Sequence, residues 1–252
     1  MKSFETFCEA VLKEIRLHFG YIYPKETLLE ITYPFIDPEL PLMILTIPDR
    51  EQEDYPVTIH REDTKKVKYY HDKKHMIDVA GLALHYYYQE TLEEALPIEG
   101  AFLFLSGIFH DLEHSLGLET DDINVSKTIA RVQELLVMPS PFNNIILNAI
   151  QATQYPKVVE PNSLIESCLV DADLTAVTFG KKAAVDIIDK LLAEINRARV
   201  IKDLDPITPK EMYKNQKEFK EHIQLNTQTA KTIYAKYADA LLEELKEMTK
   251  DD

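Results

Sequence analysis

Residues 101–114 read AFLFLSGIFHDLEH, an apolar run that ends abruptly in a His-Asp pair and a second histidine. Leu, Phe and Ile bury readily, whereas a buried imidazole or carboxylate needs hydrogen-bond partners, an opposite charge or a metal ion. We therefore expect a core helix that delivers His110 and Asp111 to a polar site. His114 follows His110 by four residues, which on a continuing helix places both side chains on one face.

Apolar residues recur at helical spacing on both sides of this run. Prolines or glycines separate the periodic stretches, as expected for helix ends. The expected helices cover residues 72–89, 98–113, 122–137, 142–153, 162–178, 180–198 and 209–248. The sequence therefore predicts an all-α fold, a helical bundle over residues 67–252 that includes the C-terminal helices in one compact unit.

Residues 1–66 show a different pattern. Residues 4–19 have the spacing of a single helix closed by Gly20, whereas residues 21–62 are interrupted by six prolines. Prolines at this density are typical of loops with at most one or two short strands. We expect a helix and a loop-rich elaboration in front of the bundle.

Composition excludes several classes of protein. The 252 residues include 28 basic and 43 acidic side chains, giving a net charge of −15. Binding nucleic acid by bulk charge requires an excess of Lys and Arg. Six glycines without a glycine-rich loop argue against a dinucleotide or P-loop site, and two cysteines against a disulfide scaffold. Acidic residues near the N-terminus and the absence of a long apolar run predict a cytoplasmic protein without a signal peptide or membrane span.

Two further polar groups interrupt apolar helical segments. His71 and His75 again stand four residues apart, and Asp171 and Asp173 lie within SLIESCLVDADLTAVTF. Either histidine pair alone is more often a satisfied structural pair, but three such groups in three helices point to convergence. Mixed nitrogen and oxygen ligands suit zinc, iron or manganese, with magnesium possible alongside. At this level either aspartate of the third group is a candidate ligand.

The order of these residues carries a resemblance. His75, then His110-Asp111, then Asp173 resembles the H…HD…D signature of the HD superfamily of metal-dependent phosphohydrolases. YHDKKHMIDVA is similar to the YHNxxHxxDV segment of cyclic-nucleotide phosphodiesterases, FHDLEH to their HDLDH, and ADLTAVT to their CDLSAIT. The resemblance covers roughly residues 67–198 and implies an HD-domain helical bundle.

The resemblance implies a first metal ion, zinc, manganese or iron, bound by four side chains. The matching positions are His75, His110, Asp111 and Asp173. The ADL-T-A pattern favours Asp173 over Asp171 for the last ligand. Stretches that carry further histidines in many HD proteins have none here, so a tightly held second metal and an HD-type di-iron oxygenase are less favoured.

The resemblance also implies roles around that metal. Asp111 would also contribute to a weaker second site for magnesium or manganese. Waters would supply most of the ligands of this second metal, and His114 would lie in its outer shell. His71 matches the residue that protonates the leaving oxygen in the phosphodiesterases. We expect Asp72, at a position where that family has Asn, to hold the His71 ring.

Five lysines cluster immediately before and within the first histidine group, at positions 65, 66, 68, 73 and 74. Such a run is usually a solvated face. Alternatively, Lys73 and Lys74 guide an anionic phosphate toward the metals.

These features together predict a metal-dependent phosphohydrolase that cleaves a phosphodiester of a small nucleotide, cyclic or a short oligonucleotide, by metal-activated water. Two alternatives stay open: a nucleotide phosphomonoesterase, and a non-catalytic binding module that keeps the scaffold. The expected partner is a small anionic phosphate. Residues 209–248 are expected to pack back on the bundle, with a homodimer contact as the alternative.

Overall fold

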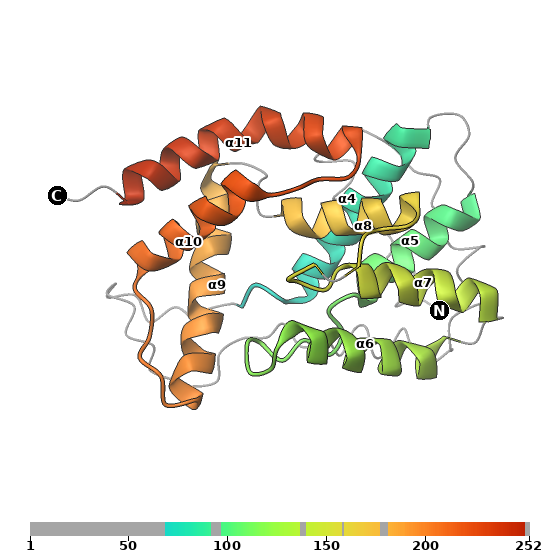
Figure 1. Cartoon of the computed structure of the whole chain (residues 1–252), viewed down its shortest axis with the longest axis horizontal. Coiled ribbons are helices and arrows are strands. Elements are labelled where there is room, and N and C mark those ends of the chain that lie inside the picture. Colours follow the sequence, from blue (N-terminus) through green and yellow to red (C-terminus); the bar gives the residue numbers. More distant parts are fainter. Residues whose placement is uncertain (1–68, 92–96, 137–139, 158, 177–180, 250–252) are drawn as a thin grey trace.

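The computed structural model describes residues 69–91, 97–136, 140–157, 159–176 and 181–249. Within these ranges the chain forms helices joined by turns and loops (Figure 1), so the predicted all-α class is confirmed. The helices are α4 (Lys73–Thr91), α5 (Pro97–Phe109), α6 (Asp121–Leu135), α7 (Ser140–Ala152), α8 (Leu164–Thr175), α9 (Lys181–Ile201), α10 (Pro209–His222) and α11 (Gln228–Thr249). The expected helix at 4–19, the loop-rich residues 21–62 and three of the five clustered lysines lie outside the described residues.

Two largely buried helices, α4 and α5, form the centre of the molecule. In α4 the side chains of Met76, Val79 and Leu84 are buried, and in α5 those of Phe102 and Leu105 are. Apolar side chains of this kind must be covered by neighbouring elements. Indeed α4 packs against α5 and α8, and α5 packs against α7. Complete burial of each such side chain stabilises the fold by about 1.5–3 kcal/mol.

The central helices approach each other most closely at a glycine. A methyl group on Gly107 of α5 would lie only 2.6 Å from the Cα atom of Ala80 in α4. No larger residue fits without moving one backbone away from the other. Gly107 therefore sets the spacing between the helix that carries His75 and the helix that ends just before His110.

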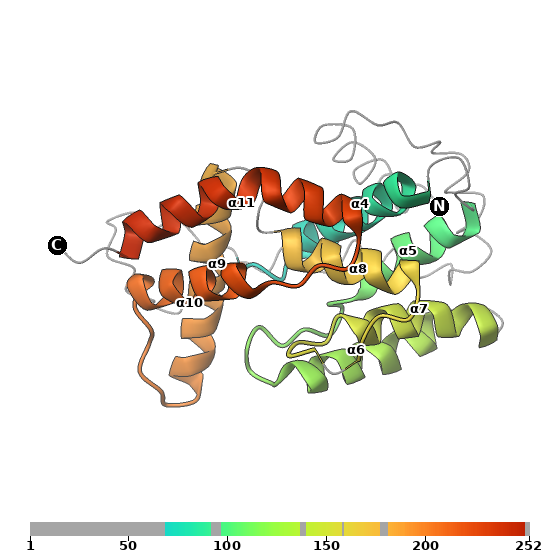
Figure 2. The same ribbon diagram turned by 45° about the horizontal axis from the view of Figure 1, so that its top comes forward.

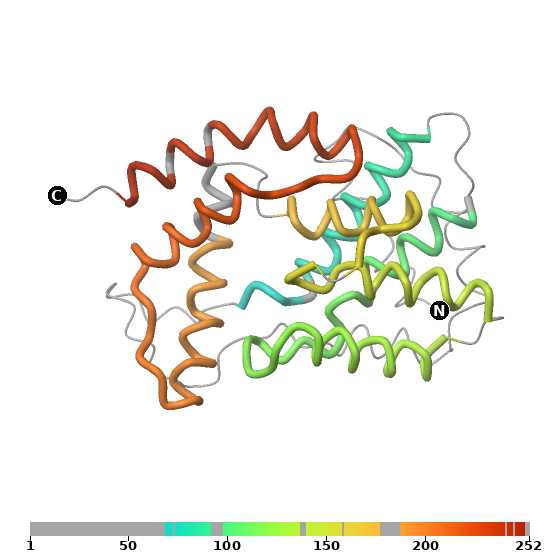
Figure 3. Tube along the Cα trace, in the orientation of Figure 1, coloured from blue at the N-terminus to red at the C-terminus, as the bar shows by residue number. Residues whose placement is uncertain are grey.

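The remaining helices flank this centre on different sides. In the views of Figures 1 and 2, α6 and α7 run side by side, while α9, α10 and the C-terminal part of α11 form the opposite end of the molecule. The trace in Figure 3 shows how α8 returns beside α4 after α5, α6 and α7. Because α11 also contacts α4, α8 and α9, the C-terminal segment packs back on the bundle.

The observed helix boundaries lie within four residues of the expected ones, except that one expected helix is divided. The stretch expected at 209–248 is divided into α10 and α11, where the Thr227 hydroxyl accepts a hydrogen bond from the amide of Ala230 as the N-cap of α11. At α5 the helix ends at Phe109, so His110 and Asp111 lie in the following turn. At α4 the helix begins at Lys73, one residue after the expected start, because the Asp72 carboxylate accepts from the amide of His75 and caps the helix.

None of the helices in the described ranges is both long enough and apolar enough to span a bilayer.

Candidate metal centre

Four predicted ligands meet at one point, from three separate parts of the fold. His75 comes from the first turn of α4, His110 and Asp111 follow the end of α5, and Asp173 lies near the end of α8. The two Nε2 atoms of the histidines are 3.2 Å apart. Oδ2 of Asp111 lies 3.2 Å from His75 Nε2 and 3.0 Å from His110 Nε2. Oδ1 of Asp173 lies 3.3 and 3.6 Å from the same atoms. We call these residues the four-ligand cluster.

The backbone fixes which nitrogen of His110 faces the cluster. Its Nδ1 atom lies 2.8 Å from the carbonyl oxygen of Gly107. A carbonyl only accepts hydrogen bonds, so Nδ1 carries the proton and the neutral ring presents the lone pair of Nε2 to its neighbours. Metal-binding histidines typically have this arrangement, in which the outer nitrogen donates to a fixed acceptor.

His75 has an unsatisfied outer nitrogen. Its Nδ1 atom is buried and has no hydrogen-bond partner among the described residues. The Nε2 side of the ring instead makes all of its close contacts within the four-ligand cluster. An imidazole held in this way is oriented by packing, including the Tyr70 ring at a centroid distance of 4.3 Å.

The four side chains also perturb each other's protonation. Burial by itself would lower the pKa of His75 and of His110, but the hydrogen bonds and charges of Asp111 and Asp173 outweigh it and raise both. Burial opposes ionisation of the two carboxyl groups, yet the histidines hold their pKa values below the usual range. Protons and a cation compete for the same lone pairs, so metal affinity should fall at low pH.

The donor set and its spacing fit a divalent metal ion. Metal–ligand distances of about 2.0–2.2 Å imply ligand–ligand distances of about 3.3–3.6 Å in a tetrahedron and about 2.8–3.1 Å between neighbours in an octahedron. The distances across the cluster, 3.0–3.6 Å, fall in these ranges. Two imidazoles and two carboxylates are ligands that suit zinc, iron or manganese. This buried His/Asp group could therefore hold a metal ion.

The two aspartates of α8 have different environments. The carboxylate of Asp171 is fully buried and turned away, toward the start of α11. It accepts hydrogen bonds from the backbone and side chains of Asn226 and Thr227, at distances of 2.7–3.0 Å. Asp171 thus anchors the N-terminus of α11. Of the two candidates, Asp173 is the one placed beside the histidines.

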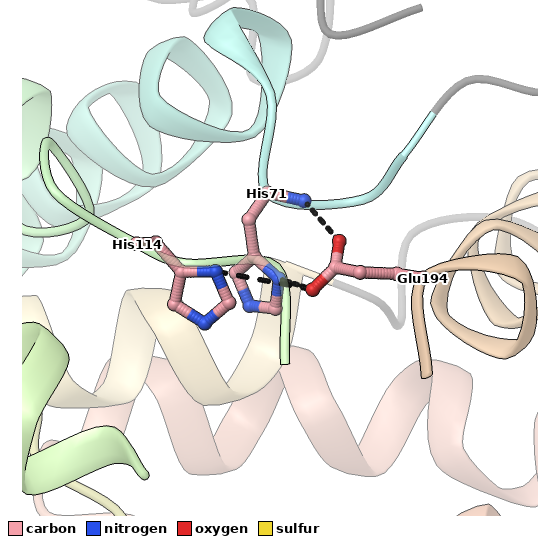
Figure 4. Close-up of side chains that lie close together, drawn as sticks. All are labelled: His71, His114 and Glu194. Atoms are coloured by element: carbon pink, nitrogen blue, oxygen red, sulfur yellow. Dashed lines mark hydrogen bonds and ion pairs between the residues drawn. The ribbon is translucent and has the colours of Figure 1, made fainter. Parts of the chain in front are cut away.

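A second group lies next to the first (Figure 4). Glu194 of α9 approaches His71 and His114 together, with its Oε1 atom 2.6 Å from His71 Nδ1 and 3.8 Å from His114 Nδ1. The two imidazole rings stack with their centroids 3.7 Å apart. We call these residues the His71–Glu194 cluster. Ligand atoms of His71, His75 and Asp111 lie within 4.8 Å of one another, so the two clusters adjoin.

The nitrogens of the His71–Glu194 cluster that face Glu194 already take part in hydrogen bonds. The backbone amide of His71 donates to Glu194 Oε2 at 3.3 Å, in addition to the short contact of its ring. The amide of Leu116 donates to His114 Nδ1 at 3.2 Å. Although the three side chains have metal-ligand types and spacing, the nitrogens that face Glu194 are already engaged. We therefore regard this cluster as a hydrogen-bonded group rather than a metal cage.

Glu194 strongly affects the charge of His71. Burial alone would lower the pKa of the imidazole, but the charge and hydrogen bond of Glu194 outweigh it and raise this pKa from 6.5 to about 9. In return, His71 lowers the pKa of the Glu194 carboxyl against the effect of burial. At neutral pH the pair is an imidazolium bonded to a carboxylate.

The turn after His114 has an unusual backbone. Leu116 has φ of 55° and Gly117 has φ of 79°, both in the left-handed region. This conformation costs a non-glycine residue about 1–2 kcal/mol. Gly117 also faces α9, where an added methyl group would lie 3.1 Å from Cβ of Ala198. The turn that holds His114 is thus fitted against the helix that supplies Glu194.

The expectations for the histidine pairs need correction. Neither pair lies on one helical face, because His71 precedes α4 and both His110 and His114 follow α5. Each pair is instead divided between the two clusters. Nor is Asp72 the partner of the His71 ring: its carboxylate caps α4, and Glu194 takes that position.

The expected substrate-guiding lysines are only partly described. Lys74 forms an exposed ion pair with Asp78, one turn further along α4, at 2.8 Å. This is the contact of a solvated helix face. The side chain of Lys73 lies outside the described part of the structure.

Sequence reasoning missed Glu194. Its signal was present, because it lies four residues before Ala198 and three after Leu191, on the side of α9 that is otherwise apolar. Glu194 is 2% exposed. A carboxylate on an apolar helical stripe costs several kcal/mol unless it is paired, and therefore predicts a partner. What periodicity does not indicate is which histidine the partner is.

A cavity of about 510 Å³ opens beside the four-ligand cluster. Asp173 lies in its wall, together with the rings of Tyr155 and Phe219, which meet edge to face, and the amides of Asn215 and Gln224. The side chain of Asp173 is 26% exposed, whereas His75 and His110 are almost fully enclosed. The volume is in the range of small-molecule sites, and Asp173 is the residue of the four-ligand cluster that lines it.

In comparisons with protein-family models and with curated proteins, nothing matched the sequence.

Proposed function

We propose that this protein is a metal-dependent phosphohydrolase that cleaves a phosphodiester of a small nucleotide, either cyclic or a short oligonucleotide. The single observation that carries the proposal is the four-ligand cluster, in which residues 75, 110, 111 and 173 place two imidazole nitrogens and two carboxylate oxygens 3.0–3.6 Å apart. The chain brings these atoms together from three separate places in the sequence, at the cost of burying their polar groups.

The residues around the cluster suit hydrolysis at phosphorus. When bound, a divalent ion would act as a Lewis acid on the phosphoryl oxygens and would acidify water. His75, His110, Asp111 and Asp173 would hold that ion. Zinc, manganese or iron matches this donor set, and a weaker second site near Asp111 would take magnesium or manganese.

His71 would supply the proton for the leaving group. Breaking the P–O bond leaves an alkoxide, which departs more easily when a nearby acid protonates it. The imidazolium of His71 is held by Glu194 through Nδ1, and Figure 4 shows its other ring nitrogen directed away from that carboxylate. A pKa of about 9 keeps the ring protonated at neutral pH. This role agrees with the residue's position in the phosphodiesterase resemblance.

The neighbouring cavity supports a small organic ester as substrate. Its size and its mixture of aromatic and amide groups suit the leaving portion of a nucleotide more than a long polymer. The net charge of −15 also opposes binding of bulk nucleic acid.

The test begins with metal content. Purified protein is analysed for bound metals, and cyclic nucleotides, dinucleotides and nucleoside phosphates are screened with Mn²⁺ or Mg²⁺. Turnover of a diester supports the proposal, turnover of monoesters alone identifies a phosphomonoesterase, and metal binding without turnover identifies a binding module. His110→Ala and Asp111→Ala should both lose metal; retention of the full metal content by both would refute the site.

A matched histidine control is available on α4. His85 lies ten residues beyond His75, which is about 15 Å along the helix axis. His85→Ala should keep metal content and turnover, which separates loss of the cluster from a general effect of removing a histidine.

A further inference from the structure

Two buried polar side chains of α6 lie against the turn that follows α5. Asn124 is 4% exposed and Thr128 is 1% exposed, and both lie on the buried face of α6 beside Val125 and Val132. Their spacing of four residues places them one turn apart on that face. Neither residue belongs to the two clusters, so the burial of their polar groups needs another explanation.

Both side chains accept hydrogen bonds from backbone amides of residues 110–116, which we call the ligand turn. Thr128 Oγ1 accepts from the amide of Glu113 at 3.1 Å, and Asn124 Oδ1 accepts from the amide of Ser115 at 3.1 Å. The Ser115 hydroxyl accepts in turn from the amide of Glu119 at 2.8 Å. The ligand turn is therefore attached to α6 at two alternate residues.

The ligand turn carries two of the four candidate ligands. Its internal hydrogen bonds join residues only three positions apart, Leu112 to Phe109 and His114 to Asp111, each at 3.0 Å. Such local bonds shape the turn but do not determine where its ligands lie relative to those of α4 and α8. The contacts with α6 do, because α6 packs against α7, which also contacts α5 and α8.

Burial alone does not account for these two residues. An apolar side chain at position 124 or 128 would avoid the cost of burying a polar group, but it would leave an amide of the ligand turn without its acceptor. The hydrogen bonds of Asn124 and Thr128 therefore serve the turn more than they serve α6 itself.

We propose that Asn124 and Thr128 are positioning residues, which hold the ligand turn so that its two ligands meet those of α4 and α8. They act through the backbone of the turn and not as ligands. Partners of this kind, one step removed from the metal ion, orient its ligands before the ion binds. The role rests on the metal site of the proposed function, and it does not depend on which ester is cleaved.

A pair of variants at position 128 tests the role. Thr128→Val nearly keeps the shape of the side chain but removes the acceptor of the Glu113 amide, whereas Thr128→Ser retains the hydroxyl. The affinity for Zn²⁺ is measured by competition with a chromophoric chelator, and the midpoint of urea unfolding is measured on metal-free samples. Valine should weaken zinc binding about 10- to 100-fold, and serine should stay within about threefold of wild type.

Thr208 provides the matched control. Its hydroxyl accepts from the amide of Glu211 at 3.2 Å as the N-cap of α10, so Thr208→Val also removes a hydroxyl acceptor from a backbone amide. This variant should lower the urea midpoint, as Thr128→Val does, but should leave the zinc affinity within about threefold of wild type. The comparison separates displacement of the ligands from loss of stability.

Hydrogen exchange tests the two contacts in the wild-type protein. In metal-free, ¹⁵N-labelled protein, the amides of Glu113 and Ser115 should exchange at least about 100-fold more slowly than unprotected amides. Asn124→Ala should release the Ser115 amide and should also weaken zinc binding, which keeps the test decisive if Thr128→Val does not fold. Unprotected exchange of both amides in the wild type overturns the inference.

The outcomes separate this role from the proposed function. Wild-type zinc affinity in Thr128→Val and Asn124→Ala, or an equal loss of affinity in Thr128→Ser or Thr208→Val, overturns the positioning role even if the protein hydrolyses a diester. The expected zinc and exchange results in a protein that hydrolyses no phosphate ester support the positioning role and refute the hydrolase. A wild type that binds no divalent metal refutes the metal site and the positioning role together.

Discussion

The two adjoining clusters use the same types of residue for different purposes. In the four-ligand cluster, two imidazole nitrogens and two carboxylate oxygens face one another at 3.0–3.6 Å, and His75 has a buried nitrogen without a hydrogen-bond partner among the described residues. In the His71–Glu194 cluster, one carboxylate and the Leu116 amide satisfy the nitrogens that face inward. The first group could hold a metal ion, whereas the second is a hydrogen-bonded group.

Backbone groups account for this difference. The Gly107 carbonyl accepts from Nδ1 of His110 and leaves its Nε2 facing the other ligands, whereas the Leu116 amide donates to Nδ1 of His114. A neutral imidazole has one donor and one acceptor nitrogen, so fixing one fixes the other. Residue identity alone therefore does not distinguish a ligand from a donor.

The largest effect is expected for the two aspartates of α8. Asp173→Asn should weaken zinc binding at least about 100-fold, because it removes a charged ligand, while stability stays near wild type. Asp171→Asn should keep zinc binding but destabilise the fold by about 2–4 kcal/mol, since an amide replaces the acceptor of the α11 N-terminus. Zinc titration and urea unfolding measure the two effects. Loss of zinc binding in Asp171→Asn together with loss of stability in Asp173→Asn would show that the two roles are assigned the wrong way round.

A second pair of variants replaces the glycine that supports each cluster, Gly107 for the four-ligand cluster and Gly117 for the His71–Glu194 cluster. Gly107→Ala forces α4 and α5 apart and should cost about 1–3 kcal/mol or more, with weaker zinc binding as His75 and His110 separate. Gly117→Ala strains a left-handed residue and should cost about 1–2 kcal/mol without changing zinc affinity. Equal zinc affinities in the two variants would contradict the distinct structural support that we assign to each cluster.

The pH dependence of stability distinguishes the clusters in metal-free protein. The pKa of His71 is raised from 6.5 to about 9, so its contribution is fully present below pH 6.5 and is lost as pH rises through about 9. Glu194→Gln should therefore destabilise most below pH 6.5, by up to about 3 kcal/mol, and least above pH 9. Urea unfolding in the presence of a chelator measures the difference, and a loss of stability that is the same at pH 6 and pH 9.5 would argue against the ion pair.

The smallest effect is expected at the lysines. Replacing Lys73 and Lys74 by Ala should change stability by less than about 0.5 kcal/mol, because Lys74 makes only an exposed ion pair. If these lysines steer the substrate, the Michaelis constant for a phosphate ester should rise severalfold at low salt. Lys214 and Lys217 of α10, also in helical ion pairs, are the matched control. A Michaelis constant unchanged at low salt leaves these lysines as a solvated face.

Most of the helices could be predicted because their signals are local. Apolar spacing and the prolines between segments place each helix within a few residues, and the uninterrupted apolar character of residues 101–109 predicts burial. For the site, the error is at the end of α5. This helix ends at Phe109 and not at 113, so His110 and His114 do not lie on the expected helical face.

The candidate ligands could be selected from the sequence, but their arrangement could not. Buried polar residues in apolar helices identify residues 75, 110, 111 and 173 as unusual, and the same rule applies to Asp171 and Glu194. Which of these face one another depends on contacts between residues 35 to 123 positions apart. Asn226 and Thr227 donate hydrogen bonds to Asp171, and α9 places Glu194 beside His71.

The sequence by itself determined the helical class, the central position of the apolar segments and the residue types available for a metal site, because these follow from periodicity and from the cost of burying polar groups. Only the tertiary structure decided how each histidine pair is divided, which aspartate faces the imidazoles and which carboxylate holds the His71 ring. Those outcomes depend on individual carbonyl and amide groups from other parts of the chain, and local sequence does not encode their positions.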